Sequence, residues 1–338
     1  MRLPSVVILA LAACAAFVAP HTALAWGSSG HRMIGQLAVQ AFPPELPAFL
    51  RTPAAASTLG ELAREPDRSK GAGRTHDADL DPAHYLDVDD HGRVLGASAL
   101  AELPATRAEF EAALRASGTD GWRAGYLPYA IVEGWQQLTR DFAYWRVEIA
   151  AARMAPDPRH RTWLAADASR RQALILNDLG DFAHYVGDGS QPLHVTVHFN
   201  GWGDYPDPER FTQARIHAYF EGEFVRRFVE PRAVATRLPP YQDCRCGIWP
   251  RTEAYLAATN AEVLPLYRLD KAGAFVHASP EGRAFVAARL AVGAAMLRDM
   301  VVDAWRASAE ASVGYPAVKV ADVLAGKLDP YDSLFGLD

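Results

Sequence analysis

The sequence predicts an all-α protein, built as a single multi-helix domain. Apolar side chains recur at the helical spacings of three and four over several long segments, and helix-capping residues precede many of these segments. The sequence contains no alternating apolar–polar run, two-residue hairpin turn or internal repeat that competes with this pattern. The chain is long for one hydrophobic core, but its length suits a single helical domain.

The helices predicted in the first part of the chain cover residues 30–41, 53–63 and 107–116. The double proline at 43–44 ends the first of them. Thr52 directly precedes a proline, which is typical of an N-cap followed by the first helical residue. Thr106 and Glu109 have the spacing of a capping box. Residues 64–104 are rich in Gly, Asp and Pro and are expected to form a long loop, which in a compact domain is usually functional or disordered.

The helices predicted in the second part cover residues 128–154, 167–187, 211–229, 252–271 and 280–310. The first of these carries four large apolar residues at spacings of three and four, from Trp135 to Trp145. Residues 195–210 are expected to form a second loop rich in Gly and Pro. Pro265 is expected to kink its helix. Ser279, which precedes a proline, is expected to cap the last helix.

The N-terminal segment predicts export. Arg2, the apolar stretch over 6–18 and the sequence Ala23-Leu24-Ala25 correspond to the three regions of a signal peptide. We therefore expect three parts: a signal peptide over residues 1–25, a helical domain over 26–310, and a mostly irregular C-terminal tail over 311–338. The sequence has no other stretch of 18 apolar residues, so no transmembrane segment is expected, and the protein is expected to be secreted or periplasmic.

Charge and cysteine content exclude several classes of protein. The chain has 34 basic and 40 acidic residues; removing Arg2 with the signal peptide leaves 33 against 40, a net charge of -7. This charge argues against a broad basic face for duplex DNA, but not against an enzyme that neutralises phosphate with bound cations. Cys244 and Cys246 would be the remaining cysteines. A disulfide between such close positions is strained and two cysteines form no disulfide framework, so we interpret them as non-catalytic.

Signal cleavage after Ala25 would give Trp26 a free α-amine. The α-amine and carbonyl oxygen of one residue can chelate a metal ion, because together with it they form a five-membered ring. His31, five residues later, can supply a third ligand. Export would then complete a metal site. The alternative is that cleavage at this point has no chemical significance and that His31 is a surface histidine.

The strongest local motif runs from His184 to His194. His184 and Asp188 are four residues apart near the end of a predicted helix, so both side chains project from one face. Gly189 and Pro192 then break the helix, and the resulting turn can bring His194 back toward Asp188. Imidazole nitrogens and carboxylate oxygens are ligands that Zn²⁺ accepts, and a carboxylate between two histidines can bridge two cations.

Two further groups extend this motif. His217 and Glu221 repeat the spacing of four residues, and Asp67 and His84 lie in the first long loop. One such pair alone is more often a solvent-facing ion pair, and Asp67 alone is typical of a loop-capping residue. Together the nine candidate ligands would supply three or four groups for each of three cations: Trp26, His31, Asp67, His84, His184, Asp188, His194, His217 and Glu221.

This joint pattern resembles the zinc-dependent S1/P1 nuclease and bacterial phospholipase C superfamily. The most specific match is the His-x3-Asp-x5-His run, with Gln191-Pro192-Leu193 inside it. The resemblance implies an all-helical fold of the phospholipase C/P1 nuclease type, with three Zn²⁺ ions at the bottom of a cleft, and hydrolysis of phosphate esters by zinc-activated water. It also implies three ligand sets: Asp67, His84, His184 and Asp188; His194, His217 and Glu221; and Trp26, His31 and Asp188.

The resemblance further implies catalytic roles for Asp67 and Lys70. Asp67 would orient the attacking water besides binding zinc. The family's nucleases carry an arginine three residues beyond this aspartate, which holds the phosphate, and here that position is Lys70, with Arg68 nearby. Lysine neutralises charge but cannot make the two-pronged contact of arginine, so we expect weaker phosphate binding. The alternative is that both are solvated loop charges.

Two substrate classes remain open, single-stranded nucleic acid and phospholipid. The short step from Trp26 to His31 and the long step from His194 to His217 favour the nuclease branch of the superfamily. Glu221 stands where nucleases usually have aspartate, which favours phospholipase C. The Gly-Gly-Asn pattern of the nucleases is also missing from the intervening loop.

Aromatic residues in that loop are candidates for substrate binding. Phe199, Trp202 and Tyr205 could stack an unpaired base, line a groove for a lipid, or anchor the loop, and Asn200 is a candidate for a base-edge contact. We expect a secreted endonuclease on single-stranded DNA or RNA, with a phospholipase C as the alternative. A third possibility is a non-catalytic periplasmic zinc-binding protein, in which every coordination position would be closed. No stable protein partner is implied. A serine hydrolase or a zinc protease is disfavoured, because their Gly-x-Ser-x-Gly and His-Glu-x-x-His motifs are absent.

Overall fold

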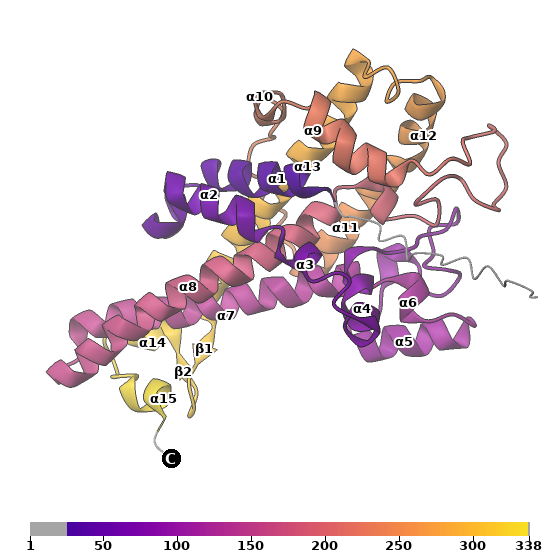
Figure 1. Ribbon diagram of the computed structural model, residues 1–338. Coiled ribbons are helices and arrows are strands. Elements are labelled where there is room, and N and C mark those ends of the chain that lie inside the picture. The colour runs from indigo at the N-terminus through magenta and orange to yellow at the C-terminus, as the bar shows by residue number, and fades with distance from the viewer. Residues whose placement is uncertain (1–25, 337–338) are drawn as a thin grey trace, which may run out of the picture.

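Two long helices, α7 (Leu127–Met154) and α8 (Pro158–Asp188), lie side by side through the centre of the molecule (Figure 1). Because only three residues join them, they run antiparallel. The structure is a computed structural model, and it describes residues 26–336. The predicted signal peptide, residues 1–25, lies outside the described residues.

The other elements are shorter, except for α13, which has 28 residues like α7. The α-helices are α1 (Ser28–Gln40), α2 (Pro53–Leu62), α3 (Glu65–Arg68), α4 (Arg74–Leu80), α5 (Arg107–Ala116), α6 (Gly121–Ala124), α9 (Val225–Phe228), α10 (Pro231–Ala235), α11 (Ile248–Asn260), α12 (Val263–Lys271), α13 (Pro280–Ala307), α14 (Val320–Leu324) and α15 (Tyr331–Phe335). The 3-10 helices are η1 (Ala48–Arg51), η2 (Asp81–His84), η3 (Leu100–Glu102), η4 (Pro192–His194) and η6 (Ser308–Glu310); η5 (Tyr219–Phe224) is a π-helix. Strands β1 (Ser312–Val313) and β2 (Val318–Lys319) pair antiparallel.

The structure confirms the all-α prediction: the described residues form one mostly helical domain. A main hydrophobic core runs between α1, α2, α7, α8, α11 and α13. Helices α1 and α2 approach closely because Gly35 and Gly60 lie at their contact. A Cβ atom on Gly35 would come within 3.0 Å of the Leu59 carbonyl oxygen. None of the helices within residues 26–336 is both long and apolar enough to cross a membrane.

Three predicted helix starts are confirmed by their caps. The Thr52 hydroxyl accepts a hydrogen bond from the backbone N–H of Ala55, and α2 begins at the following proline. Thr106 and Glu109 form the predicted capping box of α5. The Ser279 hydroxyl accepts a bond from the third residue of α13. The long α7 also lies where the aromatic spacing predicts it.

Three predicted helices have different bounds. Helix α8 begins at Pro158 instead of residue 167, because the Asp157 side chain caps it. Residues 211–216 are not helical, and the helical turns begin only with His217. The helix expected over 252–271 is two helices, α11 and α12, and Pro265 lies in the first turn of α12, where a proline is tolerated, so it causes no kink.

Two segments expected to be irregular contain structure. Residues 64–104 include α3, α4, η2 and η3, and the Asp89 carboxylate ties a turn together by accepting bonds from the backbone N–H groups of His91, Arg93 and Gly96. The C-terminal tail forms β1, β2, α14 and α15, which cover the end of the α7–α8 pair far from α4–α6 (Figure 1). Its apolar side chains form a smaller second core with α7 and α8.

Candidate metal centre

Three groups of His and carboxylate side chains among residues 26–336 could each hold a metal ion. Helix α8 ends inside this region and supplies His184 and Asp188 from its last turn. Other members come from α1, α3, η2, η4 and the turn around η5. The groups are His31, His184 and Asp188; Asp67, His84 and His184; and His194, His217 and Glu221. Apart from Asp67, which is half-buried, all these side chains are buried.

Asp188 lies between the first two groups and touches both. Its Oδ1 atom is 3.4 Å from Nε2 of His31, and its Oδ2 atom is 3.0 Å from Nδ1 of His84. Nε2 of His184 lies 3.3 Å from the same Oδ2 atom. Asp67 reaches this region from α3, with Oδ1 3.8 Å from Nε2 of His184. Asp188 therefore lies within 3.4 Å of ring nitrogens from both groups, and its bridging of two cations stays a prediction.

Hydrogen bonds fix which ring nitrogen of three histidines faces the centre. Nδ1–H of His184 donates to the Ala63 carbonyl at 2.9 Å, and Nδ1–H of His194 donates to the His84 carbonyl at 2.6 Å. Nδ1–H of His217 likewise donates to the Phe199 carbonyl at 2.8 Å. A carbonyl oxygen can only accept, so each of these nitrogens must carry the proton. The Nε2 atoms, which point toward the carboxylates, are left as metal-binding lone pairs.

Several buried polar atoms at this centre have no hydrogen-bond partner in the described part of the chain. Both ring nitrogens of His31, Oδ1 of Asp188 and Oε1 of Glu221 are in this state. Burying such groups without a partner costs free energy, and native structures contain few of them. Nitrogen and oxygen donors of these kinds are ligands for a divalent cation such as Zn²⁺. The residues present therefore fit a bound metal.

The electrostatics favour the metal-binding forms of four ligands. Burial, followed by repulsion from His184, lowers the pKa of His31 well below its usual range, and burial lowers the pKa of His84 to about 4. Both rings are therefore neutral near pH 7. Burial raises the pKa of Asp188 and Glu221, but the neighbouring histidines outweigh it, so both pKa values lie below the usual range. Both carboxylates are therefore ionised.

The pKa values of His184 and His194 are shifted upward, in contrast to those of His31 and His84. Burial lowers the pKa of each ring, yet the Asp188 carboxylate outweighs this effect and raises both pKa values above the usual range, helped at His194 by Glu221. The carboxylates thus attract positive charge to the centre, as expected for a site that holds cations.

The third group depends on a π-helix. Oε2 of Glu221 lies 2.8 Å from Nε2 of His217 and 3.4 Å from Nε2 of His194. The Gln191 amide N–H also donates to this oxygen at 3.2 Å. Glu221 belongs to η5, and π-helical turns occur often at functional sites. The wider turn sets the direction in which Glu221 leaves the helix.

Trp26 is anchored beside this third group. Its ring is fully buried, and its Nε1–H donates to the Ser190 hydroxyl at 2.8 Å. The next residue, Gly27, packs against the backbone of Glu221 and Gly222. A Cβ atom on Gly27 would lie 3.0 Å from Cα of Gly222. The chain therefore enters the domain next to the metal-binding groups, which is where an N-terminal ligand would have to be.

A cavity of about 440 Å³ reaches two of these groups. His84, from the second group, and His194, from the third, line it. The remaining lining residues are mostly aromatic, apolar or charged: Lys70, Asp81, Tyr85, Asp87, Leu95, Trp122, Arg123, Val197, Phe199 and Tyr205. Its volume is in the usual range for small-ligand sites.

The predicted substrate residues are placed differently from one another. Phe199 lines the cavity and is 44% exposed. Trp202 is buried, stacks on His198 at 3.7 Å and donates its Nε1–H to the Pro206 carbonyl, so it anchors the loop and offers no free face to a base. The Asn200 side-chain oxygen accepts a bond from the backbone N–H of His217, so Asn200 supports a candidate ligand.

The two residues predicted to act on the phosphate lie together. Nζ of Lys70 is 2.7 Å from Oδ1 of Asp67, and Lys70 lines the cavity. Arg68 instead pairs with Glu65 and is half-exposed. The lysine is therefore placed beside both the cavity and the second group of candidate ligands, whereas Arg68 is part of a surface ion pair.

Seven cavity residues were missed from the sequence as substrate contacts: Asp81, Tyr85, Asp87, Leu95, Trp122, Arg123 and Val197. Tyr85 and Asp87 follow His84 in an extended segment, in which Leu86 and Val88 alternate with them and are buried. This alternation of buried apolar and partly exposed polar residues is visible in the sequence and could have indicated that Tyr85 and Asp87 share one face. Trp122 and Arg123 come from α6, and their approach to the cavity depends on tertiary structure alone. Burial raises the pKa of Asp87 well above its usual range.

No protein-family model matches this chain. The chain also has no significant match among curated proteins. The features established here are a mostly helical fold and buried His, Asp and Glu groups that could bind metal.

Proposed function

We propose that this chain is an exported zinc-dependent phosphodiesterase, with single-stranded DNA or RNA as its leading substrate. The observation that carries the proposal is the set of three neighbouring His and carboxylate groups, two of which reach the wall of an open cavity through His84 and His194. A structural zinc site is closed by its ligands, whereas a catalytic site keeps a position open to water and substrate. The cavity therefore supports a catalytic role over a storage or purely structural one.

Different residues have different roles in the proposed hydrolysis of a phosphate ester. Bound zinc ions supply a water of lowered pKa and neutralise phosphate charge. Asp67, which pairs with the cavity residue Lys70, would orient the water. Lys70, paired with Asp67, supplies positive charge to a phosphate oxygen. Carbonyl partners hold the histidine rings in place, so the ligand positions exist before substrate arrives.

The proposal includes cleavage after Ala25. The freed α-amine and the carbonyl of Trp26 would then join His31 and Asp188 as ligands of a third zinc ion. The buried Trp26 ring and the contact of Gly27 with the Glu221–Gly222 backbone support this arrangement. Secretion or export to a periplasm is part of the same proposal, because the amine exists only after processing.

The cavity wall supports nucleic acid as the first choice of substrate. Trp122, Phe199 and Tyr205 are each at least 40% exposed and line the cavity. Exposed aromatic rings stack unpaired bases, at about 1–3 kcal/mol per base. Phospholipid is the second candidate, because Leu95 and Val197 add apolar surface to the same wall.

The test combines metal analysis with a substrate panel. The exported protein is purified, its zinc content is measured by elemental analysis, and hydrolysis of RNA, single-stranded DNA and phosphatidylcholine is followed with and without a chelator. We expect two to three zinc ions per chain and nucleic-acid cleavage that stops with chelator and returns with zinc. The His217→Ala variant should lose this activity. His277→Ala, an exposed histidine outside the centre, is the matched control.

The outcomes separate the candidate functions. Activity on phosphatidylcholine alone would replace the nuclease with a phospholipase C. Zinc binding without any hydrolysis would leave a zinc-binding protein. Less than one zinc ion per chain after zinc supplementation would reject the metal centre itself.

A further inference from the structure

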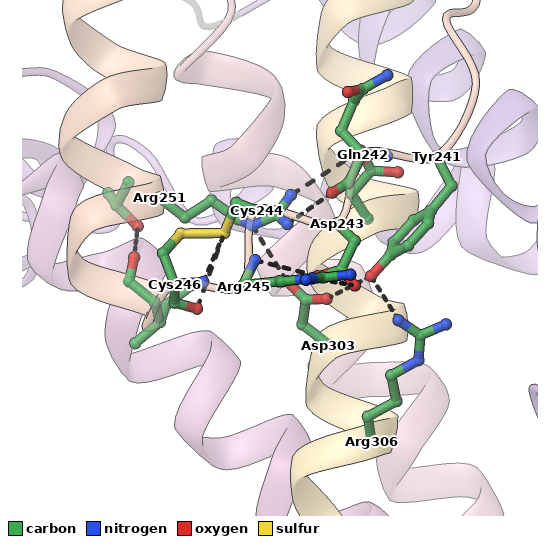
Figure 2. The surroundings of a disulfide bond; sticks show 12 residues. Tyr241, Gln242, Asp243, Cys244, Arg245, Cys246, Arg251, Asp303 and Arg306 are labelled. Atoms are coloured by element: carbon green, nitrogen blue, oxygen red, sulfur yellow. Dashed lines mark hydrogen bonds and ion pairs between the residues drawn. A yellow bond between two sulfur atoms is a disulfide. The ribbon is translucent and has the colours of Figure 1, made fainter.

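Cys244 and Cys246 form a disulfide in the loop between α10 and α11 (Figure 2). The bond joins residues only two positions apart, and both cysteines are exposed. A thiol in solution therefore has access to the sulfur atoms. Exposed disulfides are in general the labile or regulatory ones, whereas structural disulfides are shielded.

The disulfide is not what holds this loop in place. The backbone N–H of Gln242 donates to Asp299 of α13 at 3.1 Å, and Arg251 donates to the Gln242 carbonyl at 2.7 Å. The Tyr241 hydroxyl donates to Asp303 at 2.9 Å (Figure 2). In contrast, the disulfide closes a ring of three residues, and the stabilisation a disulfide gives decreases as the closed loop becomes shorter. The disulfide therefore contributes little to the stability of the loop.

The residue between the two cysteines is held in a left-handed conformation. Arg245 has φ of 48°, and its side chain is 89% exposed, so no packing of that side chain compensates for the backbone strain. Opening the disulfide frees Arg245 to return to an ordinary conformation. The oxidised form is thereby raised in free energy relative to the dithiol.

The surroundings also stabilise a thiolate at this position. The backbone N–H of Cys246 points at Sγ of Cys244, with a distance of 3.3 Å. Cys246 itself stands two residues before the first residue of α11, a helix of 13 residues whose N-terminal dipole favours negative charge. A stabilised thiolate is a better leaving group in thiol–disulfide exchange.

We infer that Cys244–Cys246 is a redox-active disulfide that exchanges with small thiols and dithiols. The attacking thiolate bonds to Sγ of Cys246, the Cys244–Cys246 bond breaks, and Cys244 leaves as a thiolate that takes a proton from water. A second thiol then attacks the attached sulfur of the first and releases Cys246 in the same way. The two reductant thiols become one disulfide, and the protein gains two electrons and two protons.

The test is a redox titration of the folded full-length chain in glutathione buffers, quenched with acid and followed by alkylation and mass spectrometry. Peptides containing Cys244 and Cys246 report this pair separately from Cys14. Circular dichroism in the same buffers confirms that the chain stays folded. We expect both thiols to appear together, within the working range of glutathione, without loss of helical signal. A pair that stays oxidised until the protein is unfolded would overturn the inference.

Arg245 provides the matched variants. Arg245→Gly removes the cost of the left-handed conformation, so the ratio of reduced to oxidised protein at a given glutathione ratio should fall about fivefold. Arg245→Lys keeps the charge and the strain and should titrate like the natural chain. An equal shift in both variants, or none in Arg245→Gly, would contradict the strain argument.

Discussion

Nε2 of His31 and Oδ1 of Asp188 lie 3.4 Å apart, with both side chains fully buried and no hydrogen bond formed by either atom among the described residues. His31 comes from the first helix and Asp188 from the last turn of α8. Two polar atoms that face each other in the core without a bond leave a place for a third partner. A cation between them would satisfy both.

Asp188→Asn should lower the zinc content and remove most of the activity. Asparagine keeps the shape of the side chain but loses the charge that attracts cations to both neighbouring groups. We expect at least one zinc ion fewer per chain and a fall in hydrolysis of about 100-fold or more. Elemental analysis and kinetics on one preparation measure both. Asp181→Asn, two turns earlier in α8, is the control; an equal loss there would show a general effect on the helix.

A chain in which one methionine precedes Trp26 should lose one zinc ion. The α-amine then lies one residue too far away to close the five-membered chelate with the Trp26 carbonyl. We expect zinc content to fall by about one ion per chain and the rate to fall with it, while circular dichroism stays unchanged. Full zinc content and full rate in this variant would exclude the amine as a ligand.

Trp122→Ala should weaken substrate binding and leave the metal in place. The ring is 51% exposed at the cavity, and the loss of one stacking contact corresponds to about a tenfold rise in KM. Trp122→Phe keeps an aromatic face and should recover most of the affinity. Zinc content should stay constant in both variants. An unchanged KM for single-stranded DNA would show that bases do not stack at this position.

Ionisation of the buried Glu148 carboxyl should make the folded protein less stable as pH rises. Burial, reinforced by Asp167, raises the pKa of Glu148 from its ordinary 4.5 to about 8, although Arg171 lies 3.9 Å away. Between these two values the folded chain holds one proton more than the unfolded chain, so the free energy of unfolding falls with rising pH. This loss should reach up to about 5 kcal/mol above pH 8.

Glu148→Gln tests this dependence, because glutamine does not titrate. Urea unfolding at several pH values between 5 and 9 should show the natural chain losing stability relative to the variant as pH increases. The exposed Glu310→Gln substitution should leave the pH dependence unchanged. Parallel stability curves for the natural chain and Glu148→Gln would contradict the prediction.

Local signals in the sequence were sufficient for much of the fold. Caps at Thr52, Thr106 and Ser279 depend on neighbouring residues, so they could be read without tertiary information. The Asp157-Pro158 start of α8 carries the same kind of signal and was overlooked. The delayed helix after residue 216 could not be predicted, because Asn200 binds the backbone N–H of His217 from a distant part of the chain.

The candidate ligands could be predicted because metal chemistry restricts the residue types and their spacing. The structure brings eight of the nine into the three groups, and Trp26 lies beside them. The substrate residues were harder, since any exposed aromatic ring can stack and the sequence does not reveal exposure. Trp202 illustrates this: its ring is buried against His198, although the loop around it is polar and rich in glycine.

The widened turn at η5 sets a strict limit on chain length. A π-helix holds one residue more in its turn than an α-helix does. Deleting a single amino acid between His217 and Glu221 would restore ordinary winding and change the position of the glutamate relative to His217 and His194. Deletions here would therefore be tolerated by the fold far better than by the chemistry, and any homologue that keeps the chemistry should keep the extra residue.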